Sequence, residues 1–134
     1  MGIVVRDLEA AGRALERLLR VRPEAVRVEA VGLRALLFPL GEAAVELLQF
    51  QGPVEGIDPA VFEPAPGIQH LAFRVEALDA ALARLERAGI RPLEGFPRPG
   101  LRGPIAFFRD PGTGALVELV ERNRCPPAPP GRRQ

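Results

Sequence analysis

The stretch PLGEAAVELL at residues 39–48 recurs as PGTGALVELV at residues 111–120, an offset of 72 residues. The shared positions include the first proline and the tripeptide Val-Glu-Leu. The coincident pairs are Pro39/Pro111, Ala43/Ala115, Val45/Val117, Glu46/Glu118 and Leu47/Leu119. In each copy apolar residues flank the glutamate, as they do in a β-strand with one buried face. The match indicates that the chain carries an internal repeat.

A second match lies earlier in each copy. The segment VRDLEAAGRALERL at residues 5–18 aligns with VEALDAALARLERA at residues 75–88, at an offset of 70 residues. Leucines recur at helical spacing in both segments, which predicts an amphipathic helix in each. Asp7 suits the N-cap of the first helix, and Gly89 suits the position just after the second. Two matches in the same order favour a tandem repeat of about 50 residues.

Each copy predicts the order strand, helix, strand, strand, strand. The strands expected in the first copy are 2–5, 25–29, 33–39 and 43–50, and the helix is 8–19. The strands expected in the second copy are 68–75, 90–93, 105–108 and 115–120, and the helix is 77–88. We expect an α+β fold in which two tandem βαβββ modules form a curved mixed sheet around a central cavity, with the helices outside.

The domain organisation follows from the repeat. Module 1 covers residues 1–50, a Pro- and Gly-rich connector covers 51–67, and module 2 covers 68–121. We expect residues 1–121 to form a single domain, since a chain of this length suits one hydrophobic core. The tail RNRCPPAPPGRRQ, residues 122–134, shows no periodicity and predicts disorder or a polyproline extension.

The composition of the 134-residue chain excludes several classes of protein. A net charge of +1 gives no strong attraction to nucleic acid or to an anionic membrane surface. No apolar run is long enough to span a membrane, and the first residues lack the pattern of a signal peptide. The single cysteine, Cys125, cannot form an internal disulfide, so we expect a cytoplasmic protein. All 18 basic residues are arginine, which excludes Schiff-base chemistry on a lysine.

The stretch GIQHLAF at residues 67–73 holds the only histidine, His70, on the first strand of the second copy. Glu46 and Glu118 occupy equivalent positions on the last strands of the two copies. A lone histidine in an apolar run is often a hydrogen-bonded core residue, and a glutamate in an alternating strand often faces solvent. If the neighbouring valines and leucines pack against the helices, however, both glutamates face the cavity, where carboxylates need a partner. One imidazole and two carboxylates suit a divalent ion such as Co²⁺, Ni²⁺, Mn²⁺, Zn²⁺ or Fe²⁺.

With these elements, residues 2–121 resemble the vicinal-oxygen-chelate proteins, the glyoxalase/bleomycin-resistance/dioxygenase superfamily. The resemblance implies a sheet that curls around a divalent metal ion, with ligands on the first and last strands of each module. It implies Glu46, His70 and Glu118 as three of these ligands. Relatives read His-x-Gly-Ile where this sequence begins Met-Gly-Ile, so the fourth ligand would precede Met1 by one residue. Either the start of the chain has been assigned too late, or three protein ligands and water hold the metal.

Within this superfamily the sequence most resembles the methylmalonyl-CoA epimerases. The similar segments are VRDLEAA, LLFPLGEAAVELL, GIQHLAFRVEALDAALARLERAGI and PRPGLRGPIAFF. The most epimerase-like of them is PRPGLRG at residues 97–103. Two places depart from the epimerase pattern. Ala30 stands where epimerases usually carry a carboxylate, with Glu29 beside it, and RDPGTG at residues 109–114 is the more general turn of the superfamily.

This resemblance implies a metal-dependent epimerase of methylmalonyl-CoA, acting by proton abstraction with stabilisation of an enediolate. It implies Glu118 as one catalytic base and Glu29 as the candidate for the other. Arg98 and Arg102 either hold the phosphates of an acyl-CoA substrate, which suit guanidinium groups, or are solvated surface residues. Two alternatives stay open: a glyoxalase I-type lyase acting on a glutathione adduct, and a non-catalytic protein that binds a small molecule. A homodimer is also implied.

Overall fold

The computed structural model describes residues 1–62 and 64–121. These residues form a mixed eight-stranded sheet in the order β2-β3-β4-β1-β5-β8-β7-β6. The strands are β1 (Gly2–Val4), β2 (Glu24–Val28), β3 (Leu33–Leu40), β4 (Ala43–Phe50), β5 (Gly67–Val75), β6 (Arg98–Pro99), β7 (Pro104–Arg109) and β8 (Leu116–Glu121). The helices are α1 (Leu8–Leu19), α2 (Pro59–Phe62) and α3 (Leu78–Arg87), with a 3-10 turn η1 (Glu29–Val31).

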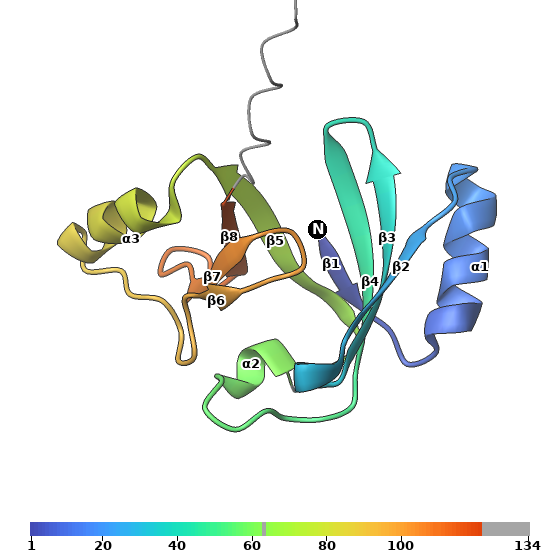
Figure 1. Cartoon of the computed structure of the whole chain (residues 1–134), viewed down its shortest axis with the longest axis horizontal. Helices are drawn as coiled ribbons and strands as arrows, with labels where there is room; N and C mark the ends of the chain where they lie inside the picture. The colour runs from blue at the N-terminus through green and yellow to red at the C-terminus, as the bar shows by residue number, and fades with distance from the viewer. Residues whose placement is uncertain (63, 122–134) are drawn as a thin grey trace, which may run out of the picture.

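The predicted fold class is confirmed by the strand order, which runs in mirrored sequence through the two modules. In each module the first strand is parallel to the last, β1 to β4 and β5 to β8, and the other pairs within a module are antiparallel. The modules meet through the antiparallel pair of β1 and β5. Figure 1 shows α1 and α3 on opposite sides of the molecule, with these two strands between them. The first strands of both modules therefore lie at the centre of the sheet.

Each long helix packs against the outer face of its own module. Leu8 of α1 is buried with Phe38 and Leu47, and α3 covers β7 and β8 in the same way. Successive side chains of a strand point to opposite faces. Because Leu47 packs under α1, Glu46 faces the concave side of the sheet. Leu119 packs in the α3 cluster and turns Glu118 to the concave side by the same alternation.

Both predicted helix caps, Asp7 and Gly89, are confirmed. Asp7 precedes α1, and its Oδ1 accepts a hydrogen bond from the backbone N of Ala10 at 2.8 Å, as expected of an N-cap. The residue before α3 is Ala77, which has no side-chain acceptor. Glu121 at the end of β8 replaces it, since its Oε2 accepts from the backbone N of Leu78 at 2.8 Å. Gly89 adopts φ +76° after α3, the left-handed conformation that favours glycine.

One predicted strand is wrong. Residues 90–93 do not form a strand, and β6 at Arg98–Pro99 takes the place beside β7 instead. Pro92 has no N–H to donate to a ladder. The backbone N of Ile90 bonds to the carbonyl of Leu85 at the end of α3, and the N of Leu93 makes a bond to the carbonyl of Phe107. The segment thus touches β7 without running along it.

The Pro- and Gly-rich connector between the modules has regular structure in its second half. It contains α2, whose start is supported by Asp58: its Oδ1 accepts from the backbone N of Ala60 at 2.9 Å. Val61 and Phe62 of this helix are buried and face the concave side of the sheet. The predicted tail, residues 122–134 with Cys125, lies outside the described residues. Within the described ranges, no helix is long and apolar enough to cross a membrane.

Candidate metal centre

A cavity of about 380 Å³ lies on the concave side of the sheet and takes its walls from both modules. Most of the side chains that line it are apolar. They include Val28, Val31, Leu33, Leu48, Phe50, Val61, Phe62, Phe96, Leu101, Ile105, Phe107 and Val120. The polar side chains on its wall are Glu46, Gln69, His70, Arg98, Arg102 and Glu118. A mostly apolar cavity with a few convergent polar groups is typical of a small-molecule site.

Three of these polar side chains converge from three strands. Glu46 lies on β4, His70 on β5 and Glu118 on β8. The Nε2 atom of His70 lies 2.9 Å from Oε2 of Glu118 and 3.8 Å from Oε2 of Glu46. One donor atom of each residue lies within 4.8 Å of the other two. His70 and Glu118 are buried, with 3% and 8% of their surface exposed, and Glu46 is half-buried.

The strand register explains why residues so far apart in sequence meet. Gly2 of β1 is paired with Glu46 on one side and with His70 on the other. On the far side of β5, Ala72 is paired with Glu118, one inward-facing position along from His70. The central strand β1 therefore brings the module 1 glutamate beside the module 2 histidine. The fold places the three predicted ligand residues together.

The donor set fits a divalent metal ion. Nε2 of His70 is buried and points at two carboxylates; although Oε2 of Glu118 lies 2.9 Å away, Nε2 makes no well-aligned hydrogen bond among the described residues. A buried polar atom left unpaired costs free energy, and two carboxylates facing each other repel. A cation bound by all three groups would remove both costs. One imidazole nitrogen and carboxylate oxygens suit Zn²⁺, Mn²⁺, Co²⁺ and Ni²⁺, and the structure does not discriminate among them.

The electrostatics of Glu46 agree with this interpretation. Burial raises the pKa of the Glu46 carboxyl above its ordinary value of 4.5, and the nearby Glu118 carboxylate raises that pKa further. His70, the N-terminal amine and Arg102 partly oppose the shift. Ionisation of Glu46 is thus less favourable in the metal-free protein than in water, as expected of a carboxylate that lacks a cationic partner.

Replacing Glu46 with Gln is expected to stabilise the metal-free protein at neutral pH. The pKa of Glu46 is raised in the folded state, so above about pH 4.5 the folded state binds more protons than the unfolded state. The free energy of unfolding of the wild type therefore falls as the pH rises from about 4.5 through the raised pKa of the folded state. The Glu46→Gln variant has no ionisable group at this position and does not lose stability in this way. Its melting temperature should exceed that of the wild type by a few degrees near pH 8, or about 1 kcal/mol, and the difference should shrink toward about pH 4.

Thermal unfolding across this pH range, in the presence of a chelator, measures the effect. Glu42→Gln is the matched control, because Glu42 is exposed in the turn between β3 and β4. A stabilisation by Glu46→Gln that is equal at both ends of the pH range would contradict the assignment to ionisation.

Of the other predicted site residues, Arg98 and Arg102 lie on the cavity wall and Glu29 does not. Arg98 and Arg102 line the cavity, and Arg102 also lies 3.7 Å from Glu24 in an exposed ion pair. Glu29 is exposed in η1, whereas its neighbour Ala30 lines the cavity. Both arginines thus lie on the cavity wall, whereas Glu29 is not among the residues that line it.

Two residues that sequence reasoning missed also contact the site. Gly2 leaves room for the histidine ring, since a Cβ at this position would lie 2.1 Å from Cε1 of His70. Gln69 shares a hydrogen bond of 2.8 Å between its Oε1 and Nδ1 of His70. The sequence signal for Gly2 is its place in the Met-Gly-Ile start, and Gln69 has no signal beyond its place next to the histidine.

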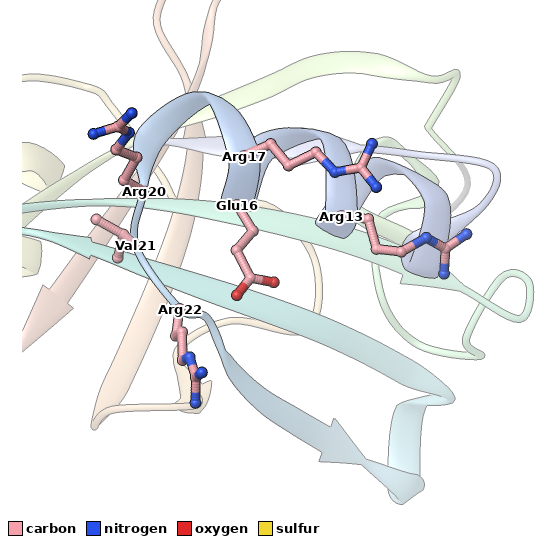
Figure 2. A pocket seen from close by; sticks show the side chains of 6 residues that line it. All are labelled: Arg13, Glu16, Arg17, Arg20, Val21 and Arg22. Atoms are coloured by element: carbon pink, nitrogen blue, oxygen red, sulfur yellow. The ribbon is translucent and has the colours of Figure 1, made fainter.

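A second hollow, of about 410 Å³, lies beside the C-terminal half of α1 on the outer side of the sheet. It is lined by Arg13, Glu16, Arg17, Arg20, Val21 and Arg22. Figure 2 shows the side chains of Arg13 and Arg17 extending to one side and those of Arg20 and Arg22 pointing elsewhere, with Glu16 between them. These groups do not converge on a common point, unlike Glu46, His70 and Glu118 in the cavity on the concave side.

Comparisons with known proteins agree with this geometry. The sequence profile of the Glyoxalase/Bleomycin resistance protein/Dioxygenase superfamily matches residues 1–108. The chain is 36% identical over 128 residues to the ethylmalonyl-CoA/methylmalonyl-CoA epimerase of Cereibacter sphaeroides, covering 90% of this chain and 94% of that protein. It is also similar to the crystal structure of methylmalonyl-CoA epimerase from Mycobacterium tuberculosis, with a TM-score of 0.72, 30% identity and coverage of 90% of this chain and 84% of that one.

A further solved structure shows a related protein with a ligand. It is a methylmalonyl-CoA epimerase in complex with methylmalonyl-CoA and NH₄⁺, with a TM-score of 0.72, 27% identity and coverage of 92% of each chain. The similarity therefore extends over nearly the whole length of these epimerases.

Proposed function

Because the chain belongs to the Glyoxalase/Bleomycin resistance protein/Dioxygenase superfamily, we propose that it is a metal-dependent epimerase of methylmalonyl-CoA. The observation that carries the proposal is the convergence of Glu46, His70 and Glu118 in one cavity built from both modules. The names of the similar proteins supply the substrate class. Three protein donors leave coordination positions that the oxygens of a small chelating substrate can fill.

The residues around the metal centre have separate roles in the proposed epimerisation. A divalent ion held by Glu46, His70 and Glu118 would supply Lewis-acid stabilisation for negative charge on the thioester oxygen of the substrate. The Glu118 carboxylate is positioned inside the cavity to take the α-proton from one face of the carbon. Glu29 is our candidate for returning a proton to the other face, and this role requires η1 to bring its exposed carboxylate to the cavity.

The walls of the cavity bind and shield the substrate. Apolar side chains such as Leu48, Phe50 and Phe62 exclude water from the reacting carbon and accept its alkyl group. Arg98 and Arg102 stand on the same wall, where guanidinium groups can pair with the carboxylate or the phosphates of an acyl-CoA. The chain has a single cysteine, as expected of a protein that acts in a reducing cytoplasm.

The test is exchange of the α-hydrogen of methylmalonyl-CoA with deuterium from heavy water. The wild-type chain, stripped of metal and then supplied with Co²⁺, is expected to catalyse exchange that the chelated protein does not. Lack of metal-dependent exchange would reject the epimerase. Isomerisation of a methylglyoxal–glutathione adduct by the same preparation would instead assign a glyoxalase I-type lyase.

One observation favours a non-catalytic alternative, in which the cavity only binds an acyl-CoA or another small molecule. Ala30 lines the cavity where the epimerases usually carry a carboxylate, and Glu29 is exposed. A protein of this kind would bind methylmalonyl-CoA, as measured by calorimetry, without catalysing exchange or isomerisation.

We further propose that the protein is a homodimer formed through the outer face of β5. Ile68, Leu71 and Phe73 are 71%, 45% and 55% exposed. They lie on the outer face of the central strand, between the areas covered by α1 and α3 (Figure 1). Exposed apolar patches mark interaction sites, and a single central patch is suited to the two-fold contact of a dimer.

Phe73→Arg is expected to convert the dimer to a monomer, because the contact would bury an arginine from each copy without a partner. Light scattering coupled to size exclusion measures the mass of the wild type and the variant. Leu18→Arg is the control, since Leu18 is 78% exposed on α1 and lies away from β5. A wild type with the mass of one chain at micromolar concentration would contradict the proposal.

A further inference from the structure

Gln69 makes hydrogen bonds from both ends of its side-chain amide. Its Nε2 donates to the backbone carbonyl of Val61 at 2.8 Å and to that of Ala60 at 3.5 Å. Its Oε1 lies 2.8 Å from Nδ1 of His70. Carbonyl oxygens accept hydrogen bonds and cannot donate them, so the two carbonyls of α2 fix which end of the amide carries the NH₂ group. The oxygen of Gln69 therefore faces the histidine.

This orientation decides the tautomer of the imidazole. An amide oxygen is an acceptor, so Nδ1 of His70 must carry the proton in this hydrogen bond. In the neutral ring the lone pair then stands on Nε2, the atom that points at Glu46 and Glu118. A histidine binds a metal through the nitrogen that bears the lone pair, and the bond made by the other nitrogen selects it.

The position of the ring is also fixed by packing. A Cβ on Gly2 would lie 2.1 Å from Cε1 and 2.5 Å from Nδ1 of His70, so the ring rests directly on the bare backbone of β1. Phe107 contacts the ring edge to face, with centroids 5.2 Å apart. The irregular pairing of β5 with β1 at this point leaves Gln69 between the paired residues Ile68 and His70. A bulge of this kind turns two consecutive side chains toward the same face, here the cavity.

We propose that Gln69 is a positioning residue that holds His70 in the Nδ1–H tautomer and ties the metal ligand to α2. The inference rests on the metal centre of the proposed function and adds a residue that acts through His70. Since Val61 and Phe62 of α2 line the cavity, the same amide links the ligand-binding wall to the metal ligand.

The test uses the fact that the chain has a single histidine, so that protein with ¹⁵N-labelled histidine and no affinity tag shows one imidazole in NMR spectra. On the basic side of the imidazole titration, the metal-free wild type is expected to show a protonated Nδ1 and a bare Nε2. In Gln69→Ala the ring is expected to redistribute toward the Nε2–H form. Gln69→Glu keeps an acceptor beside Nδ1 and should retain the Nδ1–H form while losing the bonds to α2.

The second readout is the affinity for Co²⁺ alone, measured by competition with a chelating dye. Gln69→Ala is expected to bind Co²⁺ about 10- to 100-fold more weakly than the wild type, the usual effect of removing a partner of a ligating histidine. Gln49→Ala is the matched control, because Gln49 also bridges two partners, Arg34 and the carbonyl of Arg6, away from the cavity. It should leave the tautomer and the affinity unchanged.

A wild type in the Nε2–H form overturns the proposal, whether or not the variants fold. Unchanged tautomer and unchanged Co²⁺ affinity in Gln69→Ala overturn it as well. A wild type that shows the Nδ1–H form and binds Co²⁺, but catalyses no exchange of the α-hydrogen, rejects the epimerase and leaves the role of Gln69 supported.

Discussion

His70→Ala is expected to lose the bound metal and, with it, the metal-dependent exchange activity. Nε2 of His70 lies within 4 Å of both glutamates, at 2.9 and 3.8 Å, and is the only nitrogen donor of the three-residue set. Losing a hydrogen-bond partner of a ligating histidine weakens binding by about 10- to 100-fold, so losing the ligand itself should weaken it by more than about 100-fold.

The same substitution changes the charges of the metal-free site. The positive charge that His70 can carry lowers the pKa of Glu46, so its removal raises that pKa further. The variant should then hold a proton between the two carboxylates more readily than the wild type and bind a cation less readily at mildly acidic pH. The loss of the ligand and the raised pKa of Glu46 both weaken metal binding.

Metal content after dialysis, measured by mass spectrometry, and calorimetric titration with Co²⁺ check this prediction. Gln49→Ala controls for the loss of a polar side chain from the sheet, and circular dichroism shows whether His70→Ala keeps its fold. Stoichiometric metal in folded His70→Ala would return His70 to the role of a hydrogen-bonded core residue and remove the basis of the proposed metal centre.

The fold could be predicted from sequence because its information is local and repeated. The two Val-Glu-Leu strands carry the same alternation, and each sits beside a helix whose leucines need a surface to cover. The one predicted strand that is absent, at residues 90–93, lies in a segment where the backbone cannot form the expected ladder. Pro92 has no N–H to donate at 90–93, and β6 forms later in the segment, at the edge position that β2 holds in the first module.

The site was predictable only in part, for a similar reason. Alternation places Glu46 and Glu118 on the concave face, but their meeting with His70 depends on β1 lying between β4 and β5, a contact between modules. Simple alternation would also have pointed Gln69 away from the cavity, next to the inward-facing His70. The irregular pairing between β1 and β5 turns Gln69 toward the cavity instead. The sequence of residues 67–73 gives no signal for this irregularity.

The second large effect is expected at Glu118. Glu118→Gln keeps the size of the side chain and one oxygen that can contact a metal, but it removes the carboxylate that accepts a proton. General acid–base catalysis by one side chain contributes roughly 10²- to 10⁴-fold, so the rate of α-hydrogen exchange should fall by about that factor. This corresponds to about 3 to 5 kcal/mol of transition-state stabilisation.

Because Glu118 is also a candidate ligand, the comparison has to separate the two roles. Exchange is measured at Co²⁺ concentrations that saturate both proteins, as established by calorimetry, so that weaker binding by the variant does not appear as a slower reaction. Glu121→Gln is the matched control on the same strand. The Glu121 carboxylate caps α3 through the backbone N of Leu78, so its loss affects stability without touching the cavity.

The outcome distinguishes a base from a ligand. A loss of at least about 100-fold at saturating metal, with the control unchanged, assigns proton transfer to Glu118. A variant that exchanges the α-hydrogen at nearly the wild-type rate once metal is saturating would limit Glu118 to metal binding. Since Glu46 shares the same position in the other module and the same concave face, Glu46→Gln would then be the next candidate for the base.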